Sequence, residues 1–196
     1  RDGNTAFMNA AKGKIENLKT LADLTSNIDQ TNKFGRSALS NAVASANKKA
    51  FDFLIQLGAN LNIVDHEGND LLGIAFKSYV ERKKEAFEYI IDTLSRINLQ
   101  NTITYEGGNT LAHYAVEKNS IYLTQKAIDL NVALDAKNNM GLTALHFAAM
   151  KAQDHQIIDI LLKGGANKNI RTDLEESTYD LANENDIDIS RLHAEK

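Results

Sequence analysis

Residues 141–149 read GLTALHFAA, and residues 108–116, 33 positions earlier, read GNTLAHYAV. The same phrase occurs three more times, as GNTAFMNAA (3–11), GRSALSNAV (35–43) and GNDLLGIAF (68–76). The steps between the leading glycines are 32, 33, 40 and 33 residues, and a sixth, altered copy, EESTYDLA, begins at Glu175. Recurrence at this period indicates a stack of similar structural units.

Each copy contains the signals of two short helices. The glycine permits a tight turn, and the polar residue two positions later can cap a helix that follows. These caps are Thr5, Ser37, Asp70, Thr110 and Thr143. An alanine at the seventh position after each glycine would let a neighbouring helix approach. The second half of each unit carries a helical apolar stripe, such as Phe87, Ile90, Ile91 and Leu94, and Gly58-Ala59 or Gly165-Ala166 would end that helix.

A helix-turn-helix unit of about 33 residues with a T-x-L-H-x-A phrase resembles the ankyrin repeat. The likeness covers about residues 2–190. The proline that follows the threonine in that family is missing from every copy, and the Leu-His pair is complete only at Leu145-His146. The resemblance implies an all-α solenoid of stacked helix-turn-helix units, joined by short hairpin-like loops.

We expect residues 1–196 to form a single ankyrin-repeat domain. Its repeats are predicted at about 2–31, 32–64, 65–104, 105–137 and 138–171, followed by a degenerate cap at 172–196. The third unit is longer and is predicted to carry insertions within 77–87 and 95–108, which makes it the expected weak point. One extra residue is placed near Gln153–His155. The first unit lacks an obvious N-terminal cap, which leaves open that further repeats precede it.

Composition excludes several classes of protein. The 196 residues include no Cys, so thiolate metal sites, disulfides and Cys nucleophiles are absent. The net charge of −4 disfavours a general nucleic-acid binder, and no apolar run is long enough for a membrane span. The abundance of Lys and Asn is typical of an AT-rich bacterial genome. We therefore expect a soluble bacterial protein, monomeric, in either the cytoplasm or the periplasm.

Two histidines lie within the repeated phrase. A metal pair on one helix would need a spacing such as i, i+4, whereas His113 and His146 lie in successive units. The resemblance implies that each orders its turn by hydrogen bonding. We therefore expect no metal site and no catalytic role for either residue.

The remaining charged clusters have structural interpretations. Glu175-Glu176 and the later acids match a solvated end-cap, for which Asp180-Leu181-Ala182 supplies a typical phrase, and no EF-hand loop is present. The basic run Arg82–Lys84 is flanked by glutamates and is interpreted as a solvated loop. No phosphate-binding loop and no nucleophile elbow occur, so neither a catalytic residue nor a cofactor is predicted.

The resemblance places the loop tips and first helices on a concave binding face. The predicted partner-binding residues are Lys33, Phe34, Arg36, His66, Glu67, Asn69, Tyr105, Glu106, Asn109, Asn139, Met140, Leu142, Met150 and Lys151. Phe34, Tyr105, Met140, Leu142 and Met150 are apolar where packing does not plainly require it, and aromatic residues and Met are enriched in interface cores. Partial burial against a neighbouring tip is the alternative.

These features predict a non-catalytic module that binds an unidentified partner protein. Nucleic acid and membrane insertion are not expected. Two alternatives remain open. The chain could be the ankyrin segment of a larger enzyme or effector whose catalytic part lies elsewhere, or it could be a self-associating scaffold.

Overall fold

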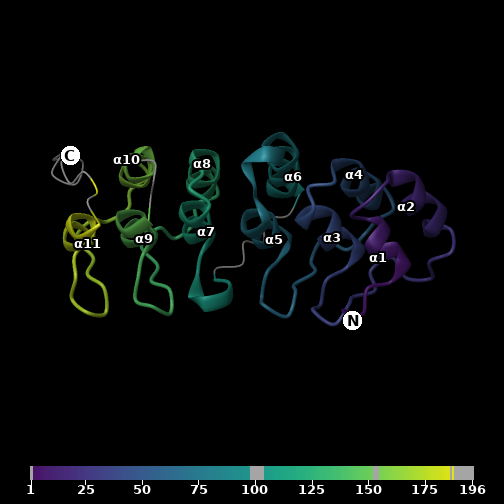
Figure 1. Cartoon of the computed structure of the whole chain (residues 1–196), viewed down its shortest axis with the longest axis horizontal. Helices are drawn as coiled ribbons and strands as arrows, with labels where there is room; N and C mark the ends of the chain where they lie inside the picture. Colours follow the sequence, from purple (N-terminus) through teal and green to yellow (C-terminus); the bar gives the residue numbers. More distant parts are fainter. Residues whose placement is uncertain (1, 98–103, 152–154, 186, 188–196) are drawn as a thin grey trace. The chain divides into compact units, whose positions relative to one another are not determined.

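The structure is a computed structural model that describes residues 2–97, 104–151, 155–185 and 187. Over these residues it is all-α, with no strand beyond an isolated antiparallel bridge between Arg171 and Ser177. The helices are α1 (Ala6–Ala10), α2 (Ile15–Ala22), α3 (Ala38–Ala44), α4 (Lys48–Gln56), α5 (Leu71–Ser78), α6 (Lys84–Ile97), α7 (Leu111–Glu117), α8 (Ile121–Asp129), α9 (Ala144–Lys151), α10 (Gln156–Lys163) and α11 (Thr178–Glu184). Two 3-10 turns, η1 (Glu81–Lys83) and η2 (Glu106–Gly108), complete the set (Figure 1).

The chain divides into two compact units, residues 1–102 and residues 103–196. In unit 1 the first helices α1, α3 and α5 pack in succession, and so do the second helices α2, α4 and α6. In unit 2 the first helices α7, α9 and α11 pack in the same way, and α8 packs against α10 (Figure 1). Each unit is therefore a stack of helical hairpins, as the repeated phrase predicts.

The predicted caps start the first helices. The Ser37 hydroxyl accepts from Ser40 N at 3.3 Å, the Asp70 carboxylate from Gly73 N at 2.7 Å, and the Thr143 hydroxyl from His146 N at 3.3 Å. Each bond satisfies an N–H group that has no partner within its own helix. The missing prolines therefore leave the helix starts intact.

The small residues of the phrase lie where helices meet. Ala42, Ala75, Ala115 and Ala148 are completely buried, whereas Ala10, in the first helix, is only half-buried. The larger apolar stripes of the second helices are also buried, as at Phe51 and Leu54 of α4 and Ile90 of α6. Within each unit, the hydrophobic core therefore runs between first and second helices and between neighbouring hairpins.

The first insertion of the third unit folds into η1, which leads directly into α6. The run Arg82–Lys84 is exposed, but it lies in these helical turns, so its interpretation as a loop is wrong. The Lys83 ammonium donates to Ser45 O at 2.6 Å, at the end of α3, and Lys84 lies 3.6 Å from the Glu81 carboxylate. The predicted insertion at 95–108, the extra residue near 153–155 and the end of the cap fall wholly or partly outside the described residues.

Candidate binding surface

The loop tips before the first helices are built around one polar side chain. Asn32 N donates to Arg36 O at 3.0 Å, which closes the turn. The Asn32 side-chain oxygen accepts from Phe34 N at 2.9 Å and from Arg36 N at 3.0 Å. An asparagine that bonds its own following backbone in this way stabilises a tight turn. The tip is therefore held by its own residues.

The same arrangement recurs at three other tips. Asp65 accepts from Glu67 N and Asn69 N, Asn138 accepts from Met140 N and Leu142 N, and Thr172 accepts from Leu174 N and Glu176 N. The tip at 105–109 differs because Tyr105 occupies the organising position. This tip forms the turn η2, in which Gly107 and Gly108 both have φ near 71°.

Neighbouring tips within a unit are joined by backbone bonds. In unit 1, Lys33 N donates to Asp2 O at 3.1 Å, and His66 N donates to Phe34 O at 2.9 Å. In unit 2, Asn139 N donates to Gly107 O at 2.8 Å. Each unit thus presents a row of tips, called here the tip row: residues 2–3, 33–35 and 66–68 in unit 1, and residues 106–108, 139–141 and 173–175 in unit 2.

Most of the residues predicted for the binding surface are accessible. Phe34 is 49% exposed and Met140 is 68% exposed, although both are apolar. Arg36, Asn109 and Met150 are half-buried. The other accessible members are Lys33, His66, Glu67, Glu106, Asn139 and Lys151, all exposed. Lys151 and Met150 end α9, where the Lys151 ammonium lies 4.7 Å from the centre of the Phe147 ring.

Three residues of that set are buried. The expectation that Tyr105 and Leu142 are apolar without a packing reason is wrong, because each is only 5% exposed. The Tyr105 ring packs on Tyr114, with 5.5 Å between ring centres. Asn69 is fully buried, and its amide nitrogen donates to the Asp65 carboxylate at 3.0 Å. These three side chains support the tips and are not available on their surface.

Ion pairs link the tips of unit 1. The Arg36 guanidinium lies 3.0 Å from the buried carboxylate of Asp65 and 3.7 Å from that of Glu67. The Lys77 ammonium, from α5, donates to Glu67 at 2.7 Å, and this bond lowers the pKa of the Glu67 carboxyl group. Glu67 of this tip row and the adjoining Arg36 and Asp65 therefore have their charges paired within the protein.

The two histidines of the repeated phrase, His113 and His146, are completely buried in unit 2. Nδ1 of His113 accepts from Thr110 N at 3.1 Å, so the proton is on Nε2, which donates to Leu142 O at 2.9 Å. His146 repeats this pattern with Thr143 N at 3.1 Å and Ile170 O at 3.0 Å. Burial lowers the pKa of both imidazoles. The prediction that these histidines order their turns is confirmed.

Some contributors to the tips were not predicted. The organisers Asn32, Asp65, Asn138 and Thr172 all stand three positions before the repeat glycine, or before Glu175 in the last copy. Leu174, 81% exposed, stands one position before Glu175, as Phe34 and Met140 stand before their glycines. The signal for both sets was their constant position in the alignment of the copies.

The described residues hold no group of three or more His, Asp or Glu side chains arranged to bind a metal ion. Over the same part of the chain, no helix combines the length and apolar character needed to cross a membrane. Stacked helical hairpins with a row of exposed tips are typical of a repeat protein. The candidate functional site of this chain is therefore an exposed surface formed by the tips.

Comparison with known proteins identifies the kind of repeat. A family model described as ankyrin repeats, in three copies, matches residues 72–172. A putative ankyrin repeat protein of Acanthamoeba polyphaga mimivirus is 31% identical, over 89% of this chain and 23% of its own length. The phosphocholine transferase AnkX of Legionella pneumophila is 28% identical, over 62% of this chain and 12% of its own length. The chain belongs to the ankyrin repeat family.

Solved structures show the same fold. A chain in the complex of a predatory endopeptidase of Bdellovibrio bacteriovorus with an immunity protein aligns with a TM-score of 0.76 and 22% identity, covering 94% of this chain and 93% of its own. An ankyrin repeat domain from Acinetobacter baumannii aligns with a TM-score of 0.74 and 25% identity, covering 92% and 91%. Ankyrin repeats generally act as protein-interaction modules, and their fold is typically non-catalytic. The chain spans no more than about a quarter of the length of the curated relatives named above.

Proposed function

We propose that the chain binds a partner protein without catalysis, through the tip rows of its two units and the adjoining ends of its first helices. The contact residues are the accessible members of the predicted set together with Leu174. This surface is supported by three buried side chains, those of Asn69, Tyr105 and Leu142.

The observation that carries the proposal is the exposure of large apolar side chains at one repeated position. Phe34, Met140 and Leu174 each precede the residue that takes a left-handed conformation at the tip, and they are 49%, 68% and 81% exposed. A single exposed apolar residue is ordinary. Recurrence at the same place in three tips favours a shared role, because a protein interface needs apolar anchors that are accessible before binding.

The construction of the tips also supports the proposal. Their backbone groups are occupied by the organising side chains and by bonds to neighbouring tips, so the anchors stand on a backbone that is already ordered. Preorganisation reduces the conformational entropy that is lost on binding. This arrangement suits a recognition surface better than an inert spacer.

The test compares matched variants of the whole chain in affinity capture from the source cell, followed by affinity measurement with the purified partner. Phe34→Ala tests unit 1, and Met140→Ala with Leu174→Ala tests unit 2. Leu24→Ala is the control, because Leu24 is 78% exposed but lies after α2, away from the tips. Replacing a hot-spot residue by alanine should lower the affinity for the partner by more than about fivefold, or about 1 kcal/mol, whereas the control variant should keep the wild-type affinity.

Equal capture by wild type and all tip variants would remove the tip rows from the function. A partner lost equally from the Leu24 control would indicate non-specific apolar adhesion. Concentration-dependent mass in sedimentation, with no partner retained, would favour the self-associating scaffold.

A second candidate is favoured by the comparisons. One relative is a transferase by name, and the matched region is 12% of its length. The chain could accordingly serve as the ankyrin segment of a longer enzyme, binding that enzyme's target while catalysis takes place outside this chain. The tip variants would then reduce capture of the target and leave turnover of a small, untethered substrate unchanged.

A further inference from the structure

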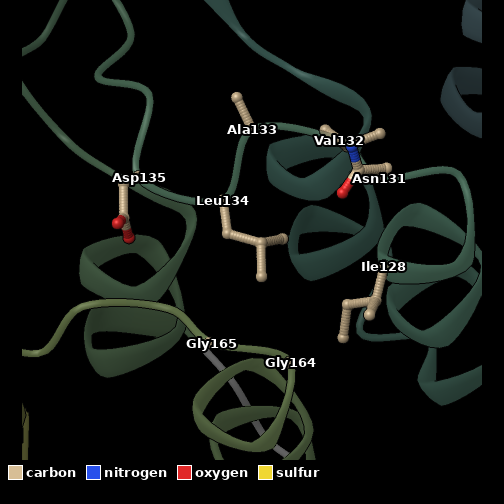
Figure 2. Close-up of a pocket in the computed structure, with 8 residues that line it drawn as sticks. All are labelled: Ile128, Asn131, Val132, Ala133, Leu134, Asp135, Gly164 and Gly165. Atoms are coloured by element: carbon tan, nitrogen blue, oxygen red, sulfur yellow. The ribbon is translucent and has the colours of Figure 1, made fainter.

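Unit 2 contains a pocket at the C-terminal ends of α8 and α10. The pocket is formed by these helix ends and by the segment that follows α8, and the tips do not contribute to it. Its volume is about 270 Å³, and its lining includes Ile128, Val132, Leu134, Asp135, Gly164 and Gly165. Figure 2 shows the Leu134 and Ile128 side chains directed into the space above the Gly164-Gly165 turn, with Asp135 at one end.

The pocket depends on Gly164. A Cβ atom at this position would lie 2.6 Å from Cδ1 of Ile128. The backbone does not require glycine there, because Gly164 has φ −72°, which any residue adopts, and the left-handed residue is the next one, Gly165. In α4 the equivalent cap is Leu57, followed by left-handed Gly58. The caps of α4 and α8 thus carry a large side chain, Leu57 and Leu130, at the position where the cap of α10 leaves a space.

The walls of the pocket differ in chemistry. Ile128, Val132 and Leu134 are half-buried aliphatic side chains. Asp135 is exposed, and one of its carboxylate oxygens accepts from Asn167 N at 2.8 Å. That bond fixes the position of the carboxylate beside the aliphatic wall. A ligand that satisfies both surfaces needs an apolar stem and a positive charge.

The helix ends favour the same sign of charge. α8 has nine residues and α10 has eight, and their caps, Leu130 and Gly164, lie at the pocket or next to it. The C-terminal end of a helix carries a partial negative charge. Lys126 and Lys163 in the last turns offset part of this field, but neither lines the pocket. Asp135 and the two helix ends therefore present a local negative potential to a bound group.

We propose that this pocket receives an arginine side chain presented by a protein partner. Its aliphatic stem lies against Ile128 and Leu134, and its guanidinium pairs with Asp135. Arginine combines an apolar stem with a planar, permanently charged group that matches a carboxylate in two-point geometry. The contact forms a second interaction site, independent of the tip rows.

The probe is N-acetyl-L-arginine amide, which presents the side chain without backbone charge. Titration into the isotope-labelled whole chain is followed by NMR through the amide signals of Gly164 and Gly165. We expect saturable shifts with a dissociation constant on the order of millimolar, as suits a ligand of this size. N-acetyl-norleucine amide, which has the stem without the charge, should bind at least about threefold more weakly.

Two variants test the two walls. Gly164→Leu introduces the residue of unit 1 and should abolish saturable binding, and Gly164→Ala provides a smaller obstruction if the leucine variant is poorly folded. Asp135→Asn retains an oxygen that can accept from Asn167 N, so it removes the charge while keeping this bond between neighbouring hairpins, and it should weaken arginine binding by about threefold. The matched control is Asp29→Asn, because Asp29 accepts from Asn60 N at 2.8 Å in unit 1 in the same way. That control should bind the probe like wild type.

Several outcomes would overturn the inference. These are norleucine binding equal to arginine binding, binding that survives both Gly164 variants, or no saturation by the arginine probe at all. Met140→Ala should not alter the titration. The experiments therefore distinguish a failure of the pocket proposal from a failure of the proposal that the tip rows bind a partner.

Discussion

Units 1 and 2 stack the same helical hairpins but join them with different side chains. In unit 2, His113 and His146 each carry a hydrogen bond from one first helix to a backbone carbonyl beside the next tip, Leu142 O and Ile170 O respectively. In unit 1 the corresponding positions hold Met8, Ser40 and Gly73.

Unit 1 uses amides and ions at its hairpin junctions, whereas unit 2 adds its imidazoles to links of those same kinds, such as the Lys137–Asp173 ion pair at 2.9 Å. The Asn41 amide donates to Met8 O at 3.2 Å, the Asn47 amide donates to Ala11 O at 3.0 Å, and Arg36 pairs with Asp65. Neutral imidazoles respond to pH, whereas partly exposed ion pairs respond to salt. Ion pairs therefore make both units sensitive to salt, whereas the buried imidazoles give unit 2 an added sensitivity to pH.

Removing an imidazole should have the largest effect. His113→Ala leaves the buried Leu142 carbonyl without its donor, His146→Ala does the same to the part-buried Ile170 carbonyl, and each leaves a cavity in place of the ring. Each should lower the free energy of unfolding of unit 2 by about 3 kcal/mol. Ser40→Ala, at the same position in unit 1, should cost under about 1 kcal/mol. Urea unfolding combined with residue-resolved hydrogen exchange measures each unit, and equal losses at all three positions would remove the distinction.

Acidic pH should also lower the free energy of unfolding of unit 2. The loss should be smaller than on removal of an imidazole, because the rings stay in place. Burial lowers the folded-state pKa of His113 and His146 below the ordinary value of 6.5, so the unfolded chain takes up protons first. The stabilisation from these rings is complete above pH 6.5 and is lost as the pH falls below it. Urea unfolding of unit 2 at about pH 7.5 and about pH 5.5 should show this loss. A double variant, H113A/H146A, that kept the full pH dependence would contradict this assignment.

The tip organisers should matter equally in both units. Asn138→Ala removes the acceptor for Met140 N and Leu142 N, and Asn32→Ala removes that for Phe34 N and Arg36 N. Each should cost about 1.5 kcal/mol in urea unfolding. Asn139→Ala is the control, because that side chain is exposed and should change stability by less than about 0.5 kcal/mol. A large difference between Asn32 and Asn138 would extend the contrast between the units to their tips.

The smallest expected effect is a gain in stability. Glu175 has φ 62° at the tip where the other copies have glycine. Glu175→Gly should therefore stabilise unit 2 by about 1 kcal/mol in thermal or urea unfolding. Gly141→Ala should have the opposite sign, because its φ is 74° and its Cβ would collide with Asp173. A neutral result at Glu175 would show that this tip relaxes without strain.

The repeated phrase predicted the helices and their caps, because these depend on interactions between residues a few positions apart. It also predicted the structural role of His113 and His146, through the resemblance to the ankyrin repeat. The accessibility of the tips was predicted less well. Tyr105 is covered by Tyr114 and Asn69 bonds Asp65, and neither contact is visible in a period or an apolar stripe. The pocket was also unpredictable, because Gly164 matters through Ile128, which lies 36 positions away in the neighbouring hairpin.

The sequence separation between hydrogen-bonded residues of neighbouring hairpins affects the folding kinetics. The side-chain hydrogen bonds described above that join neighbouring hairpins connect residues between 24 and 38 positions apart. Closing such a loop costs little more entropy than closing a shorter one, so a hairpin can dock soon after its neighbour forms. Folding can begin in either unit and spread outward, as in other repeat arrays. The chain contains no proline, so slow prolyl isomerisation should not delay this process.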